Sequence, residues 1–461
     1  MRILHYFLGF PPYRTGGLTK FALDLMSSQA TEQHIVMALW PGQIKHLSKS
    51  PIIKKRKNKG NIQNYELINP LPIPLDEGIT AFEQYMKPSN ITIYESLFRE
   101  LSPDVIHIHT LMGLHQEFIQ AAKAMHIKTI FTTHDYFGIC PMVTLYSNGA
   151  SCENDHDCHD CIHCNRTALS LHKIMLMQSP LYRVLKDTGA MKLARKYHRN
   201  QFYNQQNIPL TDLTDSDFDN TAKKYKELRG YYLKMLQDID LIHFNSTLTE
   251  SIYRKYITPN DSTVITITHT NISDNRKSIH WQYSGKLKIA YLASIKPYKG
   301  FQILKQALDE LWNEGKHDFI LKMYNAPSEY SPYIIPFDKE FQYSRLDSVF
   351  EDIDVLVAPS IWYETFGFTV LEAISYGVPV IISDHVGAKD LVQNTGIIVK
   401  AGSTESLKNA ISSFTPETIR KLRENILIHS NIKTWGQFIN EIYKIYGDKQ
   451  EVQKCVSFLS C

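Results

Sequence analysis

The sequence lacks any apolar run long enough to cross a bilayer. A spanning helix needs about 20 consecutive apolar residues, whereas the apolar stretches here, such as residues 354–360, have the length of a strand. The first residues are apolar, but Pro11, Pro12 and Arg14 follow where a signal peptide would carry a small-residue cleavage site. We therefore expect a cytoplasmic chain that begins with a buried strand over residues 1–10.

The sequence also lacks an excess of charge of either sign. It has 50 Lys plus Arg against 47 Asp plus Glu, a formal net charge of +3. A dedicated nucleic-acid binder usually concentrates basic residues on one surface, so we expect no nucleic-acid partner. At roughly 100 to 200 residues per domain, the 461 residues predict two or three globular domains.

Cysteine is scarce, and its distribution does not suit a secreted disulfide framework. There are seven cysteines, an odd number, and the following five fall within residues 140–164: Cys140, Cys152, Cys158, Cys161 and Cys164. Overlapping Cys-x2-Cys spacings are typical of tetrahedral zinc sites. We predict a structural zinc held by Cys152, Cys161 and Cys164 with either Cys140 or Cys158. The alternatives are an unmetallated thiol-rich loop and a redox pair.

Short runs of Ile, Val and Leu, each followed by a turn and a helical pattern, predict parallel sheets with crossover helices. The first such helix is expected over residues 18–29. A polar, turn-rich stretch separates two sets of these runs. We predict the following organisation: an N-terminal Rossmann-like domain over 1–270, a linker over 271–286, a C-terminal Rossmann-like domain over 287–430, a helix over 431–447 and a tail over 448–461.

Three segments interrupt the N-terminal pattern. They are the Cys-rich insert (140–164), a largely helical insertion (169–236) and a basic segment (45–60). The basic segment is interpreted as a solvated loop, and peripheral contact with an anionic membrane is the alternative.

The stretch 362–381 carries the strongest chemical signal. A helix predicted to start near Thr369 would leave the amides of Gly367, Phe368 and Thr369 unpaired, and such amides favour an anion such as a diphosphate. Glu372, expected in the first turn, could accept hydrogen bonds from a ribose diol, and Glu364 would face the transferred group. Without further context, the alternative is that Glu364 is a surface-loop residue and Glu372 merely an acidic residue at a helix start.

Glu364 and Glu372, with Phe366-Gly367 between them and Gly377-Val-Pro-Val-Ile after them, resemble the E-x7-E signature of retaining GT-B nucleotide-sugar glycosyltransferases of the family-four class. Gly16-Gly17 resembles that family's N-terminal glycine loop, 297–300 its lysine motif, and 435–446 its C-terminal helix, which in the family crosses back to the N-terminal domain. The Cys-bearing insert is similar to one in some bacterial members. The resemblance implies an α/β GT-B fold, with two Rossmann-like doubly wound parallel-sheet domains facing a cleft.

The resemblance also implies roles for individual residues. Lys299 would contact the donor diphosphate, Glu372 the ribose, and Glu364 the donor sugar. His134 would lie near the reacting sugar, although a strand-end histidine with a structural role is the alternative. The implied donor-binding set is Gly16, Gly17, Lys296, Lys299, Glu364, Phe366, Gly367, Phe368, Thr369 and Glu372, and the acceptor-side set is His109, His134 and Asp135.

The sequence departs from the family pattern at two places. The family's Gly-Arg pair before the lysine is replaced by Ala293-Ser294, and Lys296 would supply a point charge in place of the arginine fork. The glycine-rich turn after the next strand is also replaced, by residues 323–327. The sequence therefore does not predict which nucleotide base the protein recognises.

The resemblance implies front-face transfer with retention, in which the amides and Lys299 stabilise the departing diphosphate. No cofactor is expected for catalysis, because the Asp-x-Asp pairs at 238–240 and 352–354 lead into strands.

We expect a bacterial enzyme that moves a sugar from a nucleotide-diphosphate sugar to a glycan, glycolipid or other acceptor, in surface polysaccharide or glycolipid assembly. It would act in the cytoplasm or peripherally at the inner face of the cell membrane. One alternative is a non-catalytic GT-B partner subunit, suggested by Ser294 and disfavoured by the Glu364 and Glu372 pair. The other is a nucleotide-sugar epimerase, which would convert donor without acceptor.

Overall fold

The computed structural model describes residues 1–45, 50–147, 149–153, 157–188, 215–276, 281–324, 331–337 and 346–447. The chain divides into two compact units. The first unit comprises Met1–Ser147, Cys152–Phe244 and Ile252–Thr263, and the second comprises Asn148–Ser151, Asn245–Ser251 and Val264–Cys461. The segment expected to be a linker, 271–286, belongs to the second unit, which already begins its main stretch at Val264.

The first unit is built on an eight-stranded sheet in the order β10-β9-β6-β5-β1-β2-β4-β3. Its strands are β1 (Arg2–Tyr6), β2 (Ile35–Pro41), β3 (Ile52–Lys59), β4 (Ile62–Ile68), β5 (Val105–Ile108), β6 (Lys128–Thr132), β9 (Leu241–Phe244) and β10 (Ser262–Val264). Central β1 pairs in parallel with β2 and β5. The central strands are fully buried, which explains why they are near-continuous apolar runs in the sequence.

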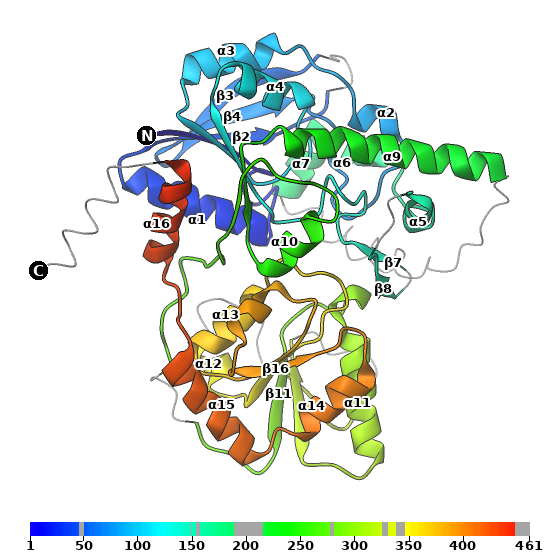
Figure 1. The fold of residues 1–461 in the computed structure, drawn as a ribbon, viewed down its shortest axis with the longest axis vertical. Helices are drawn as coiled ribbons and strands as arrows, with labels where there is room; N and C mark the ends of the chain where they lie inside the picture. Colours follow the sequence, from blue (N-terminus) through cyan, green and yellow to red (C-terminus); the bar gives the residue numbers. More distant parts are fainter. Residues whose placement is uncertain are drawn as a thin grey trace, which may run out of the picture. The chain divides into compact units, whose positions relative to one another are not determined.

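The helices of the first unit are α1 (Gly17–Thr31), α2 (Phe82–Tyr85), α3 (Thr92–Leu101), α4 (Gln116–Ala124), α5 (His159–Cys164), α6 (Leu171–Met177), α7 (Pro180–Asp187) and α9 (Asp215–Gln237). Most of α10 (Thr247–Tyr253) belongs to the second unit. A small ribbon of β7 (Tyr146–Ser147) and β8 (Ala150–Ser151) lies in the Cys-rich insert. The expected helical insertion contains α6, α7 and the long α9 (Figure 1), while 189–214 lie outside the described residues.

The expectation of a solvated loop over 45–60 is wrong for most of the segment. Residues 52–59 form β3, which pairs antiparallel with β4 at the edge of the sheet. Its side chains are almost all exposed, so the strand needs no apolar alternation and shows none. Lysines on an edge strand discourage pairing with further strands. The hydropathy pattern therefore did not reveal this strand, which is held in the sheet mainly by its backbone.

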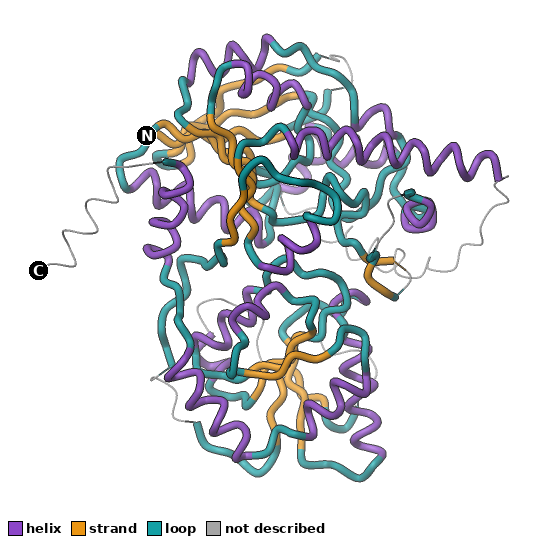
Figure 2. The backbone as a smooth tube through the Cα atoms, viewed as in Figure 1, coloured by secondary structure: helices purple, strands orange, loops and turns teal. Residues whose placement is uncertain are grey.

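The second unit is built on a six-stranded sheet in the order β13-β12-β11-β14-β15-β16. The strands are β11 (Leu287–Tyr291), β12 (Phe319–Met323), β13 (Ile334–Pro336), β14 (Val355–Ala358), β15 (Val380–Ser383) and β16 (Gly396–Val399). All adjacent pairs are parallel. The helical segments are η2 (Pro297–Lys299), α11 (Phe301–Asn313), α12 (Leu346–Phe350), α13 (Phe368–Ser375), η4 (Gly387–Leu391), α14 (Thr404–Ser412), α15 (Pro416–His429) and α16 (Trp435–Tyr446). Helices flank this sheet on both faces (Figure 2).

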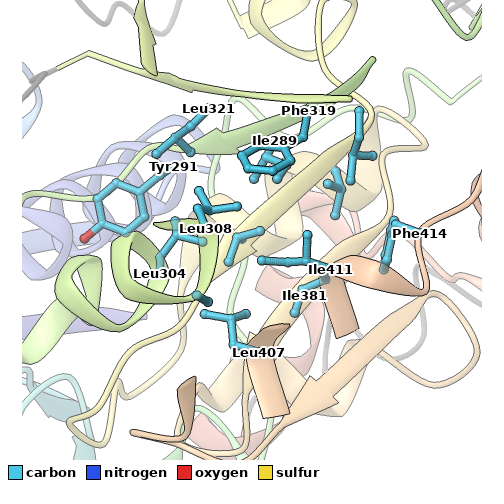
Figure 3. Packing of buried hydrophobic residues seen from close by; sticks show 14 of the residues in the cluster. Ile289, Tyr291, Leu304, Leu308, Phe319, Leu321, Ile381, Leu407, Ile411 and Phe414 are labelled. Atoms are coloured by element: carbon cyan, nitrogen blue, oxygen red, sulfur yellow. The ribbon is translucent and has the colours of Figure 1, made fainter. Parts of the chain in front are cut away.

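One face of this sheet packs against α11 and α14. Leu304 and Leu308 of α11 and Leu407 of α14 lie in one buried cluster with Ile289 of β11 and Leu321 of β12 (Figure 3). Burying each such side chain contributes about 1.5–3 kcal/mol. This packing fixes α11, and therefore also the loop that joins β11 to the start of that helix.

In each sheet the chain order reverses at a central strand. In the second sheet, β11 lies between β12 and β14, and in the first, β1 lies between β2 and β5. Open parallel sheets bind ligands beyond the carboxyl ends of the strands at such reversals. The loops after β11 and β14, and those after β1 and β5, are therefore the places to look for function.

None of the helices in the described part of the chain is long and apolar enough to cross a membrane.

Candidate functional site

Backbone hydrogen bonds join the loop that follows β14 to the loop that follows β15. The backbone N–H of Glu364 donates to His385 O (2.8 Å), and that of Gly387 donates to Glu364 O (2.9 Å). A Cβ at Gly387 would lie 2.2 Å from Thr365 O, so a side chain at this position would push the two loops apart. The backbone on either side of Glu364 is thus held in place before any ligand binds.

The carboxylate of Glu364 pairs with Lys299. Lys299 Nζ lies 2.8 Å from Glu364 Oε1, and Ser360 Oγ donates to Oε2 at 2.6 Å. Burial alone would raise the pKa of Glu364, but the positive charge and hydrogen bond of Lys299 and the Ser360 hydroxyl outweigh it and lower that pKa. Glu364 is therefore ionised at neutral pH, beside a cation.

A glycine allows the lysine loop to approach β14. Gly300, directly after Lys299, has φ 77°, and a Cβ there would lie 1.9 Å from Pro359 O. Ile361 N donates to Tyr298 O at 2.9 Å, which joins the loops after β11 and β14. The sequence therefore brings Lys299 to Glu364 by a contact that only glycine permits.

Two aromatic rings border the lysines of this loop. Lys299 Nζ lies 4.8 Å from the centroid of the Trp362 ring, and Lys296 Nζ lies 5.3 Å from that of Tyr298. Both distances are within the range of cation–π contacts. Lys296 therefore stacks on its own loop, while Lys299 points to Glu364.

The helix of the motif begins one residue earlier than predicted. Gly367 (φ 101°) is the N-cap of α13, and Phe368 is its first residue. A Cβ at Gly367 would lie 2.9 Å from Val386 Cγ1, so glycine also fits the packing. The first N–H groups of any helix lack intrahelical acceptors and favour an anion, which at α13 includes those of Phe368 and Thr369.

The prediction that Glu372 lies in the first turn is wrong, because α13 starts at Phe368 and Glu372 is its fifth residue. Its side chain is buried, and its Oε1 lies 3.1 Å from His269 Nε2. His269 Nδ1 accepts from Asn271 N–H at 3.3 Å. Nε2 therefore carries the ring proton and donates it to Glu372. Sequence reasoning missed His269, which lies just before the stretch interpreted as the linker.

In the first unit, the structure brings together His109 and His134. His109 Nδ1 lies 3.3 Å from His134 Nε2, and the rings stack. His109 Nε2 lies 3.0 Å from Nδ1 of His5, which sequence reasoning missed. Two more buried histidines flank Thr132: His107 Nε2 lies 2.7 Å and His243 Nδ1 lies 2.9 Å from its Oγ1.

Strand register could have revealed the missed histidines. His5 pairs with His107 across β1 and β5, and Thr132 pairs with His243 across β6 and β9. Burial lowers the pKa of His5 to about 4 and that of His134 to about 3. These rings are neutral at pH 7, so each carries one donor nitrogen and one acceptor nitrogen.

Asp135 accepts hydrogen bonds within the first unit, and two glycines lie where the loop after β1 enters its helix. Asp135 accepts from Phe137 N–H (2.9 Å) and Thr110 Oγ1 (3.1 Å). Burial still raises the pKa of Asp135 to about 6. Gly16 (φ 121°) is the N-cap of α1 and Gly17 its first residue, so both lie directly in the turn between β1 and its helix.

The five cysteines of the insert form no disulfide in the structure. Arg229 of α9 donates from Nη2 to Cys161 Sγ (3.3 Å) and from Nε to Ile139 O (2.9 Å). Burial raises the pKa of Cys140 to about 11. Within the described ranges, the group with three candidate ligand atoms inside 4.8 Å is His5, His107 and His109. The zinc site at the cysteines stays a prediction.

The buried histidines predict a loss of stability in mild acid. The unfolded chain binds protons below pH 6.5, whereas His5 takes one up only near pH 4 and His134 only near pH 3. The free energy of unfolding is therefore unaffected by the titration of these histidines above pH 6.5. Below that pH it falls by up to about 1.4 kcal/mol per pH unit for each histidine. Urea unfolding between pH 7.5 and 5 should show this slope. His5→Gln should flatten it and His172→Gln, an exposed control, should not; equal slopes in all three proteins would contradict the account.

Comparison with known proteins gives a match to part of the second unit. The family model described as glycosyl transferases group 1 matches residues 337–427, which contain both glutamates of the motif. Over 83 residues the chain is 31% identical to the lipopolysaccharide core biosynthesis mannosyltransferase LpsB of Rhizobium meliloti (strain 1021). That stretch is 17% of this chain and spans 23% of the length of this curated relative.

The fold is similar to solved structures over nearly the whole chain. A glycosyltransferase from Rickettsia africae ESF-5 gives a TM-score of 0.56 at 14% identity, over 96% of this chain and 97% of that one. Sucrose-phosphate synthase from Thermosynechococcus elongatus gives 0.54 at 13%, over 96% and 98%. HepE of Anabaena, in complex with UDP, gives 0.53 at 12%, over 97% and 100%. The predicted fold class is confirmed: the chain has a GT-B fold, and its second unit carries a segment similar to the group 1 glycosyl transferases.

Proposed function

We propose that this protein is a retaining glycosyltransferase that transfers a sugar from a nucleotide-diphosphate sugar to an acceptor. The observation that carries the proposal is the Lys299 and Glu364 pair at the chain reversal between β11 and β14. Glu364 and Glu372 both lie within the segment that matches the group 1 family. A cation, a carboxylate and a helix N-terminus thus stand together where open sheets bind nucleotides.

In this proposal the second unit binds the donor. Lys299 and the first amides of α13 would stabilise the negative charge that builds on the leaving diphosphate. Glu372, held by His269, would accept hydrogen bonds from the ribose hydroxyls. Glu364 would lie by the donor sugar, and Lys296 would add positive charge. The leaving diphosphate itself would take the acceptor proton, so the proposal includes no protein base and no metal.

We propose that the first unit contributes His134 to the reacting sugar and His109 and Asp135 to the acceptor side. Gly16 and Gly17 would border the donor at the turn after β1. These roles follow the family resemblance. They agree with the position of Gly16, His109, His134 and Asp135 in the loops that follow β1, β5 and β6, and of Gly17 at the start of α1.

A glycan or glycolipid of the bacterial surface is the proposed acceptor, in keeping with the lipopolysaccharide core biosynthesis for which the LpsB relative is named. The enzyme would act in the cytoplasm, at the inner face of the membrane. Leu181 and Val184 of α7 are 65% and 59% exposed. Glu66 accepts from Arg56 of β3 and from Arg183 of α7, so the basic strand and the helix that carries these apolar side chains share an ion-pair partner. Apolar and basic residues together favour an anionic lipid surface.

We also propose that the cysteines of the insert bind a structural zinc. Thiolates are the ligands zinc prefers, and zinc must bind them deprotonated. A hydrogen bond with Cys158 and burial raise the pKa of Cys161, and Arg229, fixed by Ile139 O, opposes that rise with a positive charge at Cys161 Sγ. The set would be Cys152, Cys161 and Cys164 with either Cys140 or Cys158.

The donor site predicts separate effects for its two main residues. Glu372→Gln should weaken nucleotide-sugar binding about tenfold or more, because it removes a charged hydrogen-bond acceptor. Lys299→Ala should lower kcat about 10²-fold, because it removes charge that stabilises the leaving group. Calorimetry and slow donor hydrolysis measure the two effects. Glu424→Gln and Lys421→Ala, both exposed on α15, are the matched controls. Wild-type binding and turnover in both site variants would refute this assignment.

The insert predicts bound zinc. Metal analysis of the purified protein should find zinc that Cys161→Ser, Cys164→Ser or their combination removes, since the site loses thiolate ligands. The substitution His5→Phe should leave that zinc in place. Protein free of zinc after purification in zinc-supplemented medium would rule the site out.

The basic strand predicts salt-dependent binding to anionic vesicles. The double variant Lys54→Glu/Lys57→Glu should lose co-sedimentation with phosphatidylglycerol vesicles, because each lysine near such a surface contributes about 1 kcal/mol. Lys400→Glu/Lys421→Glu, a pair of exposed lysines in the second unit, should retain it. Equal binding of all three proteins, or none, would exclude this surface.

A further inference from the structure

A chain of buried side chains runs through the first unit and ends at His134. Gln29 Oε1 of α1 lies 2.7 Å from His5 Nε2 in β1. His5 Nδ1 lies 3.0 Å from His109 Nε2, after β5, and His109 Nδ1 lies 3.3 Å from His134 Nε2, after β6. Gln29, His5 and His109 are completely buried. His5 and His134 lie 129 positions apart in the sequence, and the order of the strands brings the three histidines together.

Gln29, at one end of this series of hydrogen-bonded side chains, sets the direction of every hydrogen bond in the series. The amide oxygen of Gln29 can only accept, so the proton of His5 must be on Nε2. A neutral imidazole has one ring proton, so His5 Nδ1 accepts and His109 Nε2 donates. By the same step, His109 Nδ1 accepts and His134 Nε2 donates. His134 is thereby the tautomer with an unprotonated Nδ1.

The surroundings keep these rings neutral. Burial lowers the pKa of His5 to about 4 and that of His134 to about 3, and it holds the pKa of His109 well below the usual range. The neighbouring rings of His107 and His243 further disfavour a second proton on His109. The direction of these hydrogen bonds requires a single proton on each ring, and this is therefore the stable state at neutral pH.

We propose that Gln29, His5 and His109 are positioning residues that hold His134 with Nδ1 as a hydrogen-bond acceptor for a hydroxyl of the donor sugar. The inference rests on the proposed function for the identity of that ligand. A neutral acceptor orients the hydroxyl without adding charge to the site. The wrong tautomer would present a donor in its place, and wrong tautomers are costly in enzymes that depend on an oriented histidine.

A metal at the same residues would give the opposite result. His5, His107 and His109 have candidate ligand atoms within 4.8 Å of one another. If a metal bound His109 Nε2, His109 would carry its proton on Nδ1 and donate to His134 Nε2. His134 would then be protonated on Nδ1. The protonation state of one nitrogen thus separates the positioning chain from a metal site.

The first measurement is long-range ¹H–¹⁵N NMR of the full chain with ¹⁵N-labelled histidine, which distinguishes protonated from unprotonated ring nitrogens. The spectrum of the wild type should show His134 protonated on Nε2 only, with its signals assigned through the loss of peaks in His134→Gln. A proton on Nδ1, or a metal that His5→Phe and His109→Phe each remove, would overturn the proposal.

The second measurement compares variants. Gln29→Met removes the acceptor at similar volume, and it should mix the two His134 tautomers and lower kcat about tenfold with unchanged nucleotide affinity. His5→Phe should do the same. Thr19→Val, a buried polar change on the same helix, is the control for packing and should change neither quantity. A fall in kcat without a change of tautomer would overturn the proposal.

The two proposals fail differently. If His134 has the expected tautomer and Gln29→Met alters it, but no nucleotide sugar binds or turns over, the proposed function is wrong and the sugar ligand with it. If donor binds and turns over with His134 in the other tautomer, the positioning chain is wrong and the proposed function stands.

Discussion

The candidate donor site depends on one close approach, that of Gly300 to the carbonyl of Pro359. A side chain at Gly300 would overlap that carbonyl, and the loops after β11 and β14 could not meet. Because they do meet, Lys299 reaches Glu364 and the pair is formed before ligand binds. The buried cluster beneath α11 holds the loop from the other side. Charge is thus preorganised at the sheet's reversal, which is what stabilisation of a leaving diphosphate requires.

The two units use histidine in related ways. In the second unit, a backbone N–H fixes the tautomer of His269, which then orients Glu372. In the first, the amide oxygen of Gln29 fixes His5, and through it His109 and His134. In both cases a group with only one hydrogen-bonding role decides the role of a ring that has two. Burial keeps the first-unit rings neutral, so the direction persists at neutral pH.

Much of the fold and the donor motif could be predicted from the sequence, because both depend on local sequence patterns. Apolar runs predicted the strands, and the spacing of Glu364, Gly367 and Glu372 predicted a loop before a helix. The helix start was one residue late, since the left-handed conformation of Gly367 decides where α13 begins. Glu372 consequently lies deeper in the helix than expected. Strand β3 was missed because an exposed edge strand needs no alternation.

The histidine chain could not have been read from local patterns. His5, His109 and His134 come from separate crossover units, and only the parallel order β6-β5-β1 places them side by side. His107 and His243 enter by the same register. His269 was passed over because its surroundings are polar and turn-like, which is typical of a linker. Contacts of this kind become visible only once strand order is known.

The central claim is that the second unit binds a nucleotide-diphosphate sugar between Lys299, Glu364 and Glu372. The most direct test is binding and slow hydrolysis of a panel of UDP-, GDP- and dTDP-sugars by the wild-type protein. The account predicts that one donor binds selectively and is slowly hydrolysed with release of its nucleoside diphosphate. Absence of binding to every donor in the panel would contradict it and would favour a non-catalytic partner subunit with the same fold.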